Sequence, residues 1–129
     1  MIIGVGVDLC AIARMEKAIK KEHFTSRVFT AGERAYMDAR GALRAHSAAA
    51  MFAAKEAAAK ALKTGFSGGV MPAQIEVAHE ESGAPSLVFH GAALERFKEI
   101  GGTRAHLSLS HEGDMAIAYA MIEGEPLRG

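Results

Sequence analysis

The sequence has one cysteine, no tryptophan, three prolines and no net charge. A single thiol, Cys10, can form neither an intrachain disulfide nor a cysteine-rich zinc site, and it fits a reducing, cytoplasmic setting. Fifteen basic residues balance fifteen acidic ones, whereas nucleic-acid-binding proteins usually have a basic excess or stripe. The N-terminus lacks the pattern of a signal peptide, and no apolar run approaches the roughly 20 residues that span a bilayer. We therefore expect a soluble cytoplasmic protein that binds neither nucleic acid nor a membrane.

The composition instead favours one globular domain. The chain has 129 residues, half of them hydrophobic, and a domain usually has about 150. Its 26 alanines are densest between positions 48 and 61. Small side chains allow close helix packing but supply little bulk, and oligomerisation is one way to bury more surface. We expect a single domain over residues 1–123 and a C-terminal tail at 124–129.

Residues 2–9 alternate as a β-strand does. One face carries Ile3, Val5, Val7 and Leu9, and the other carries Ile2, Gly4, Gly6 and Asp8. The glycines would let another backbone or a ligand approach their face closely. Asp8 lies at the end of this cleared face and is therefore a candidate functional residue.

Periodicity and capping patterns predict the remaining elements. Helices are expected at 11–22, 30–40, 47–63 and 92–100, and strands at 75–79, 86–90, 105–110 and 115–122. Thr30 and Glu33 have the spacing of a capping box, Ser47 could cap the long alanine-rich helix, and Gly65 lies where its C-terminal cap belongs. The order β-α-α-α-β-β-α-β-β is typical of an α+β fold with a mainly antiparallel sheet.

Glu56 and Lys60 are four residues apart in the long helix and share one of its faces. On spacing alone they would form an exposed ion pair. Almost all of their neighbours in the sequence are small and apolar, which favours a site or an interface.

Asp8 could be a turn residue or a helix N-cap. Together with Glu56 it could instead bind one hard divalent cation, because Mg²⁺ prefers oxygen ligands and is held by one or two carboxylates with water and substrate phosphates. Lys55, Lys60 and Lys63 could then contact the same polyanion.

The six histidines form no evident metal site. His106 and His111 are five residues apart on an extended segment, so their side chains point to opposite faces. His111 is a candidate because it lies at a strand–turn junction beside Ser110. The sequence has no P-loop, and no Ser/His/Asp or Cys/His arrangement can be assembled by spacing.

Three segments carry a resemblance to a known family. They are Gly4-Val-Gly-Val-Asp8, Phe52-Ala-Ala-Lys-Glu-Ala-Ala-Ala-Lys60 followed by Thr64-Gly65, and His106-Leu-Ser-Leu-Ser-His111. Together they resemble the holo-[acyl-carrier-protein] synthases, the short bacterial type of 4′-phosphopantetheinyl transferase. The resemblance runs from Met1 to about Glu123, and the combination of G-x-D with K-E-A-x-x-K makes it specific.

The resemblance implies the phosphopantetheinyl transferase fold, a homotrimer, and three active sites at subunit boundaries. Coenzyme A would be the donor, a serine of apo-acyl carrier protein the acceptor, and adenosine 3′,5′-bisphosphate the released product, in fatty acid biosynthesis. Asp8 and Glu56 would bind Mg²⁺ with the diphosphate, and Lys60 would neutralise phosphate charge. The expected contacts to coenzyme A are Lys55, Lys60, Lys63, Gly65, Ser110 and His111.

The chemistry of the implied reaction also suggests roles. The serine attacks a phosphorus whose oxygens already carry negative charge, so the protein has to position the reactants and neutralise charge. Deprotonation of the serine needs a base, which we expect to be Glu56 or a metal-bound water that Glu56 orients.

The carrier is strongly acidic in this family, so a basic surface is expected to bind it. Arg14 matches a position at which family members contact the carrier, and Arg27, with Phe24 nearby, is a second candidate. The alternative for both arginines is an ordinary solvated helix face.

Met51 departs from the family pattern. Many members have a basic residue just before F-A-A-K-E, where it helps to hold a phosphate of coenzyme A. Lys55, Lys63 or Arg44 could take its place.

Two other functions use part of these features. A non-catalytic subunit that binds acyl carrier protein would need the Arg14 surface, and a nucleotide-binding regulator would need the metal site. The presence of Asp8, Glu56 and Lys60 together favours the enzyme.

Overall fold

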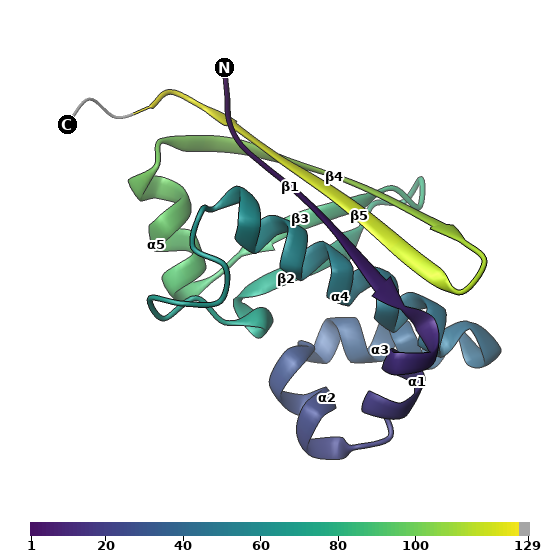
Figure 1. The fold of residues 1–129 in the computed structure, drawn as a ribbon. Coiled ribbons are helices and arrows are strands. Elements are labelled where there is room, and N and C mark those ends of the chain that lie inside the picture. Colours follow the sequence, from purple (N-terminus) through teal and green to yellow (C-terminus); the bar gives the residue numbers. More distant parts are fainter. Residues whose placement is uncertain (127–129) are drawn as a thin grey trace.

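Two antiparallel sheets and the helices packed against them make up the fold, which the computed structural model describes for residues 1–126 (Figure 1). The helices and strands in chain order are β1 (Ile2–Ala11), α1 (Ile12–Ala18), α2 (Glu22–Val28), α3 (Ala31–Ala39), the 3-10 turn η1 (Gly41–Leu43), α4 (Arg44–Ala61), the 3-10 turn η2 (Pro72–Gln74), β2 (Ile75–His79), β3 (Pro85–Phe89), α5 (Gly91–Glu99), β4 (Gly102–Glu112) and β5 (Met115–Gly124). The three-stranded sheet has the order β1-β5-β4, and β2 and β3 form the second sheet. The predicted α+β class and antiparallel pairing are therefore confirmed.

Helix α4 covers the glycine face of β1. A Cβ atom at Gly4 would lie 2.1 Å from the carbonyl oxygen of Ala61, and one at Gly6 would lie 1.9 Å from that of Ala57. No side chain fits in these spaces, so the two glycines allow the helix backbone to lie directly on the strand. The close approach predicted for this face is confirmed.

The start of α4 differs from the prediction. The helix begins at Arg44, directly after the turn η1, and Leu43 is its N-cap residue without a side-chain cap. Ser47 lies inside the helix, where its hydroxyl accepts a hydrogen bond from Nε of Arg40 at 3.3 Å. The prediction that Ser47 caps the helix is therefore wrong, because η1 already turns the chain into the helical path.

The end of α4 differs as well. The helix ends at Ala61, and Lys63 is the first residue beyond it with a left-handed backbone, at φ 68°. The amide of Lys63 donates to the carbonyl of Lys60 at 2.9 Å, and the amide of Gly65 donates to that of Ala59 at 3.1 Å. Gly65 also has a left-handed backbone, at φ 59°. It lies two residues after Lys63, so Lys63 and not Gly65 is the first left-handed residue after the helix.

The segment between β1 and α3 contains a helix that the sequence pattern missed. The first helix ends at Ala18, and a separate helix, α2, spans Glu22–Val28. Its two buried residues are Thr25 and Val28, which give too little apolar periodicity to mark a helix. The capping box at the start of α3 is confirmed, since the amide of Glu33 donates to Oγ1 of Thr30 at 3.1 Å and the amide of Thr30 donates to Oε1 of Glu33 at 2.8 Å.

Both predicted hairpins are present. Strand β5 continues to Gly124, whose amide donates to the carbonyl of Met1 at 2.9 Å, so the tail predicted at 124–129 starts later than expected. Residues 127–129 of that tail lie outside the described residues. No helix within residues 1–126 is both long and apolar enough to cross a bilayer.

Candidate active site

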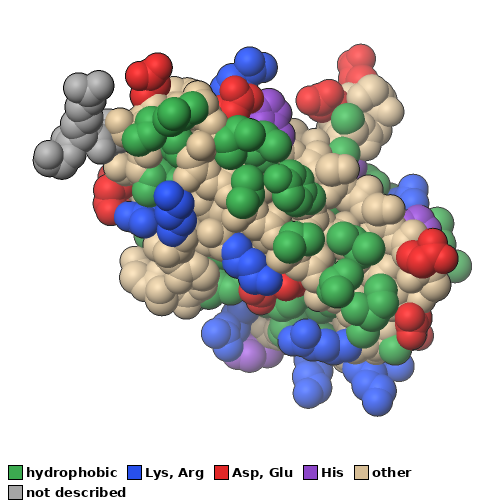
Figure 2. Space-filling view, turned by 45° about the horizontal axis from the view of Figure 1, so that its top comes forward, with side chains coloured by type: hydrophobic (Ala, Val, Ile, Leu, Met, Phe, Trp, Pro, Cys, Tyr) green, Lys and Arg blue, Asp and Glu red, His purple; other side chains and the backbone are tan. Residues whose placement is uncertain are grey.

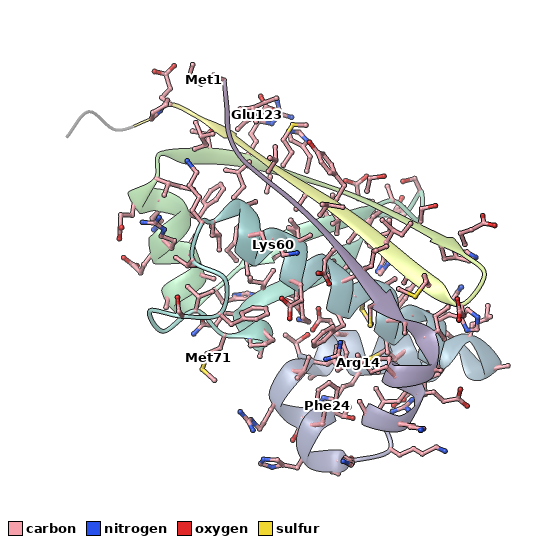
Figure 3. All side chains as sticks on the ribbon, viewed as in Figure 1. Met1, Arg14, Phe24, Lys60, Met71 and Glu123 are labelled. Atoms are coloured by element: carbon pink, nitrogen blue, oxygen red, sulfur yellow. The ribbon has the colours of Figure 1, made fainter. Side chains whose placement is uncertain are left out.

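Asp8 of β1 and two charged residues of α4 meet where the helix lies on the strand. Oδ1 of Asp8 accepts a hydrogen bond from Nζ of Lys60 at 3.1 Å, and the same ammonium donates to the carbonyl of Val7 at 2.9 Å. Figure 3 shows Lys60 on the side of α4 that borders β1. The close packing allowed by Gly4 and Gly6 therefore produces this charged cluster from residues about 50 positions apart in the chain.

Glu56 lies one helical turn before Lys60 and is half-buried. Burial raises the pKa of Glu56, and the negative charge of Asp8 raises it further, whereas the nearby Lys60 and Arg14 lower it. The Asp8 carboxylate is thus close enough to disfavour the charge on Glu56. A cation placed between them would relieve this repulsion.

The donor set fits a hard divalent cation. Both candidate ligands offer carboxylate oxygens, and Mg²⁺ usually takes only one or two protein carboxylates and fills the rest of its shell with water and substrate phosphates. Within residues 1–126 no group of three or more His, Cys, Asp or Glu side chains could hold a metal ion. Asp8 and Glu56 therefore suit a cation shared with a phosphate substrate.

The predicted carrier-binding residues lie on one continuous surface beside this cluster. The guanidinium of Arg14 lies 5.6 Å from the ring centroid of Phe52, which packs against Phe24 with 6.2 Å between ring centroids. Phe24 and Arg27 line a surface cavity of about 180 Å³ together with Met71. Figure 3 shows Arg14 and Phe24 below Lys60, on the helices that follow β1.

Lys55 is not available to a ligand, contrary to the prediction that it contacts coenzyme A. Its side chain is completely buried, and Nζ donates to Oε1 of Glu33 at 2.7 Å and to the carbonyls of Pro72 at 3.0 Å and Ile75 at 2.7 Å. An ammonium has three donors, and all three are used. Burial lowers the pKa of Lys55, and the Glu33 carboxylate opposes that effect.

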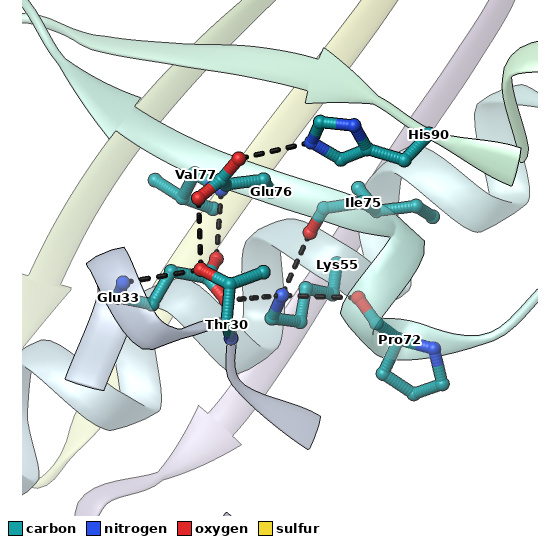
Figure 4. A network of polar contacts seen from close by, with 8 residues as sticks. All are labelled: Thr30, Glu33, Lys55, Pro72, Ile75, Glu76, Val77 and His90. Atoms are coloured by element: carbon teal, nitrogen blue, oxygen red, sulfur yellow. Dashed lines mark hydrogen bonds and ion pairs between the residues drawn. The ribbon is translucent and has the colours of Figure 1, made fainter. Parts of the chain in front are cut away.

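The Lys55 ammonium is part of a larger polar network that extends from the buried Glu33 to the half-exposed His90 (Figure 4). The second carboxylate oxygen of Glu33 accepts from the amide of Val77 at 2.7 Å, and Oγ1 of Thr30 donates to Glu76 at 2.8 Å. Glu76 also pairs with Nε2 of His90 at 2.9 Å. These contacts tie α3, α4 and β2 together, so this part of the molecule is structural.

Lys63 and Gly65 follow the C-terminal end of α4, beyond Lys60. The Lys63 side chain is exposed and lines a groove of about 330 Å³ together with residues 2–5 of β1. Of the lysines predicted to contact coenzyme A, Lys60 and Lys63 are therefore accessible and Lys55 is not.

His111 lies in a different place, beside the N-terminal half of α4. Its ring meets that of His46 edge to face, with 6.5 Å between centroids, and both rings line a cavity of about 220 Å³. The ring of His79 stacks on Tyr36 in this cavity at 3.9 Å, and the guanidinium of Arg40 lies 5.8 Å from the Tyr36 ring. Burial and the Arg40 charge lower the pKa of His79.

Sequence reasoning missed Tyr36, Arg40, His46 and His79. The one local signal was the i,i+4 spacing of Tyr36 in α3 and Arg40 at its C-cap, which puts them on one side of the helix. None of the three residues proposed to replace a base at Met51 lines this cavity. Lys55 is buried, Arg44 pairs with Asp38 at 2.9 Å, and Lys63 lines the groove beside β1. Met51 itself is buried.

One chain does not bring all the predicted site residues together. Asp8 pairs with Ala118 of β5, and His111 pairs with Ala116 of β5 from its other side, so the two residues lie on the outer strands of the sheet. Neighbouring strands are about 4.8 Å apart, which separates their backbones by roughly 10 Å. Ser110 is exposed on the opposite sheet face from His111, as strand alternation requires.

Comparisons with known proteins agree with one another. The model of the 4′-phosphopantetheinyl transferase superfamily matches residues 4–120. The holo-[acyl-carrier-protein] synthase of Methylobacterium sp. (strain 4-46) is 48% identical over 132 residues, which cover 99% of this chain and 97% of that protein. The crystal structure of holo-[acyl-carrier-protein] synthase from Neisseria meningitidis matches with a TM-score of 0.85 at 34% identity, over 95% of this chain and 99% of that one. The synthase of Bacillus anthracis, solved in complex with CoA (3′,5′-ADP), matches with a TM-score of 0.80 at 32% identity, over 97% and 99%.

Proposed function

Because this chain belongs to the 4′-phosphopantetheinyl transferase superfamily and is an enzyme of the holo-[acyl-carrier-protein] synthase type, we propose that it transfers 4′-phosphopantetheine from coenzyme A to a serine of apo-acyl carrier protein. Adenosine 3′,5′-bisphosphate is the second product, Mg²⁺ is required, and the holo-carrier serves fatty acid biosynthesis. The observation that carries this proposal is the meeting of Asp8, Glu56 and Lys60 at one edge of the β1–α4 contact.

Asp8 and Glu56 are the residues that would hold Mg²⁺. The bound ion supplies positive charge to the diphosphate and stabilises the departing bisphosphate. Lys60 uses two of its three donors on Asp8 and Val7, and the third is free for a phosphate oxygen. Its half-exposed ammonium can reach a ligand without leaving these partners.

Glu56 is the proposed base for the serine, either directly or by orienting a metal-bound water. Within residues 1–126 its side chain accepts no hydrogen bond, whereas Asp8 is already bonded to Lys60. As the bond from the serine oxygen to phosphorus forms, the bond from that phosphorus to the bridging oxygen breaks, and the serine proton passes to Glu56 or to the water that Glu56 orients. The reaction requires positioning and charge neutralisation more than covalent chemistry by the protein.

The surface of Arg14, Phe24 and Arg27 is the proposed docking site for the carrier. Exposed Arg27 lines an apolar cavity there, and exposed Arg14 lies over the ring of Phe52, near enough to Glu56 to lower its pKa. The acidic groups of the carrier would pair with Arg14 and Arg27, and its apolar groups would contact the cavity lined by Phe24. This arrangement would bring the carrier's serine to the metal-binding carboxylates.

The outer face of the three-stranded sheet supports the proposal of a trimer. Val5, Val7, Leu9 and Tyr119 are each 42–56% exposed there, and Figure 2 shows hydrophobic side chains gathered across one face. Contiguous apolar surface of this kind usually marks an interface. Assembly around it could place His111 of one subunit near Asp8 of the next, which one chain does not achieve. Sedimentation at micromolar concentration would then give about three times 13.6 kDa.

The cavity at His111 is the proposed place for the nucleotide of coenzyme A. Arg40 supplies a cationic group there, His46 and His111 supply ring nitrogens, and Tyr36 supplies an aromatic wall. Arg40 and His46 could thus provide the phosphate contact that Met51 cannot make.

Mass spectrometry tests the proposed reaction. Apo-carrier incubated with coenzyme A, Mg²⁺ and the wild-type protein should gain the mass of one phosphopantetheine arm on its serine. Omitting Mg²⁺ should abolish the gain. If every apo-carrier tested binds the protein but none gains mass, the protein is a carrier-binding subunit and the proposal is wrong.

A further inference from the structure

Gln74 in the turn η2 holds two segments of the chain with a single oxygen atom. Its Oε1 accepts a hydrogen bond from the amide of Met71 at 3.1 Å and another from the amide of Ala93 at 3.2 Å. Ala93 lies in the first turn of α5, whose N-cap residue His90 makes no side-chain cap, so Gln74 satisfies an amide that the helix itself leaves without a partner. Gln74 therefore ties Met71 to the start of α5.

The backbone on both sides of the bond between Met71 and Pro72 is fixed. The carbonyl of Met71 accepts a hydrogen bond from the amide of Gln74 at 3.0 Å, and the carbonyl of Pro72 accepts one from the buried ammonium of Lys55 at 3.0 Å. Surface connections are usually more mobile than the elements they join. This one is held by side chains from η2 and from α4.

The side chain of Met71 extends outward from this fixed backbone. It is 49% exposed, and Figure 3 shows it projecting away from the segment before β2. Together with Pro72 it lines one side of the cavity of about 180 Å³ that Phe24 and Arg27 also line. A methionine adapts its shape to an apolar partner, so a fixed backbone that presents one suits a docking contact.

The position of the cavity identifies the partner as the carrier. Arg27 adds positive charge to the cavity, which is continuous with the surface proposed to bind the acidic carrier. Lys55 directly precedes Glu56 in α4, so its bond to Pro72 also fixes where this side of the cavity lies relative to the proposed base. A carrier seated there would present its serine at a defined distance from Glu56.

We propose that Met71 is an apolar contact for the carrier and that Gln74 is a positioning residue that holds Met71 in place for this contact. The inference rests on the proposed function and extends its docking site. Without Gln74, carrier binding would have to order the segment around Met71, and this ordering weakens binding. The loss should therefore raise the KM for the carrier while kcat and the KM for coenzyme A stay nearly unchanged.

Two variants of Gln74 test the role of its oxygen. Gln74→Ala removes the acceptor and should raise the KM for the carrier about fivefold, the effect of having to order one flexible side chain on binding. Its Tm should also fall by a few degrees, because α5 loses its cap. In the described chain only the oxygen of the Gln74 amide has hydrogen-bond partners, so Gln74→Glu, which keeps an acceptor there, should have a KM close to that of wild type.

Gly83→Ala is the matched control for stability. Gly83 lies in the turn between β2 and β3 at φ 91°, and a Cβ atom there would meet nothing within 4 Å. Alanine at this position is therefore destabilising through its backbone alone and does not touch the cavity. The Tm of this variant should fall while its KM for the carrier stays unchanged.

A double variant tests whether Gln74 acts through Met71. Met71→Ala should itself raise the KM for the carrier, because it removes the side chain that makes the contact. Adding Gln74→Ala should raise this KM little further, since no Met71 side chain is left to hold. Two fold-changes that multiply would show that Gln74 does not act through Met71.

Other outcomes would also overturn the inference. A Gln74→Ala protein with a lower Tm and an unchanged KM for the carrier would show that Gln74 is only structural. A similar rise in this KM in Gly83→Ala would show a general effect of stability. If the wild type fails to transfer, the proposed function fails, and calorimetric titration of apo-carrier into wild type, Gln74→Ala and Met71→Ala then tests the contact separately. Equal affinities, or no binding to any of the three, would overturn it.

Discussion

Lys55 and Glu56 are consecutive residues of α4, yet the polar groups around Lys55 are saturated whereas those around Glu56 are not. The Lys55 ammonium is completely buried and has three acceptors, among them a carboxylate that accepts further bonds from backbone amides. Glu56 is half-buried beside Asp8, and burial and the Asp8 charge raise its pKa. Both regions combine carboxylates with lysine. Only around Glu56 does a negative charge remain that a bound cation could neutralise.

A structural ion pair and a ligand-binding site can therefore be distinguished by whether their donors and acceptors are all used within the chain. A buried pair whose donors and acceptors are all used fixes the packing of α3, α4 and β2 and has nothing to offer a substrate. Two carboxylates that share one lysine at the surface are less stable without a cation than with one.

Lys55→Met should have the largest effect on stability. It leaves the buried Glu33 carboxylate without its cation, and breaking a buried pair in this way costs about 3–5 kcal/mol. Denaturant unfolding of the variant and of a Lys98→Met control measures the loss. A cost below about 1 kcal/mol would show that the buried network is not structural.

Asp8→Asn should have the largest effect on activity. Transfer should fall by several orders of magnitude, because the cation loses an anionic ligand while the fold is retained. Mass-spectrometric assays with Asp114→Asn as the control, a change in the turn between β4 and β5, measure this loss. Asp8 lies within β1 and not at a helix N-cap, so full activity of the variant would show that its carboxylate does not hold the cation.

Arg14→Gln should have a smaller and more selective effect. We expect the KM for the carrier to rise about tenfold at low salt, with the difference shrinking as salt screens the charge, and the KM for coenzyme A to stay nearly unchanged. Glutamine is preferable to glutamate here because Arg14 also influences the pKa of Glu56. Steady-state kinetics at two salt concentrations measure both KM values. An equal rise in the KM for the carrier and in the KM for coenzyme A would show that Arg14 is not on the carrier surface.

Glu76→Gln should have the smallest effect, visible only as a pH dependence. Hydrogen bonds from His90 and Thr30 lower the pKa of Glu76 from its usual 4.5. A carboxyl with a lowered folded-state pKa stabilises the fold above its ordinary pKa and loses this contribution as pH falls through the folded-state value. The difference in Tm between wild type and variant should therefore be largest at about pH 6 and should shrink by about pH 3. A difference that grows towards acid would contradict the assigned bonds.

The sequence predicted the parts of the fold that depend on local geometry. Thr30 and Glu33 form the expected capping box because their side chains bond to backbone only three residues away. Gly4 and Gly6 mark a close approach because only an absent side chain allows it. The contact of Asp8 with Lys60 then follows from the motif spacing once α4 is placed on β1.

The remaining features depend on tertiary contacts that no local pattern contains. Lys55 and Lys63 look alike in sequence, and only the fold shows that one is buried against Glu33 and the other exposed in a left-handed turn. The cavity of Tyr36, Arg40 and His46 gathers residues from α3 and α4 beside β4, so spacing along the chain could not assemble it. Helix α2 was missed because it has too few apolar residues for a periodic signal.

The central claim, that Asp8 and Glu56 form an unsatisfied pair completed by a cation, is tested most directly by thermal unfolding of wild type and Asp8→Asn with and without Mg²⁺. In metal-free buffer at neutral pH the variant should melt no lower than wild type, because removing one charge relieves the repulsion between the carboxylates. Added Mg²⁺ should raise the Tm of wild type more than that of the variant, since a ligand that binds only the folded state stabilises it. A variant that melts several degrees lower in metal-free buffer and responds to Mg²⁺ as wild type does would contradict the account.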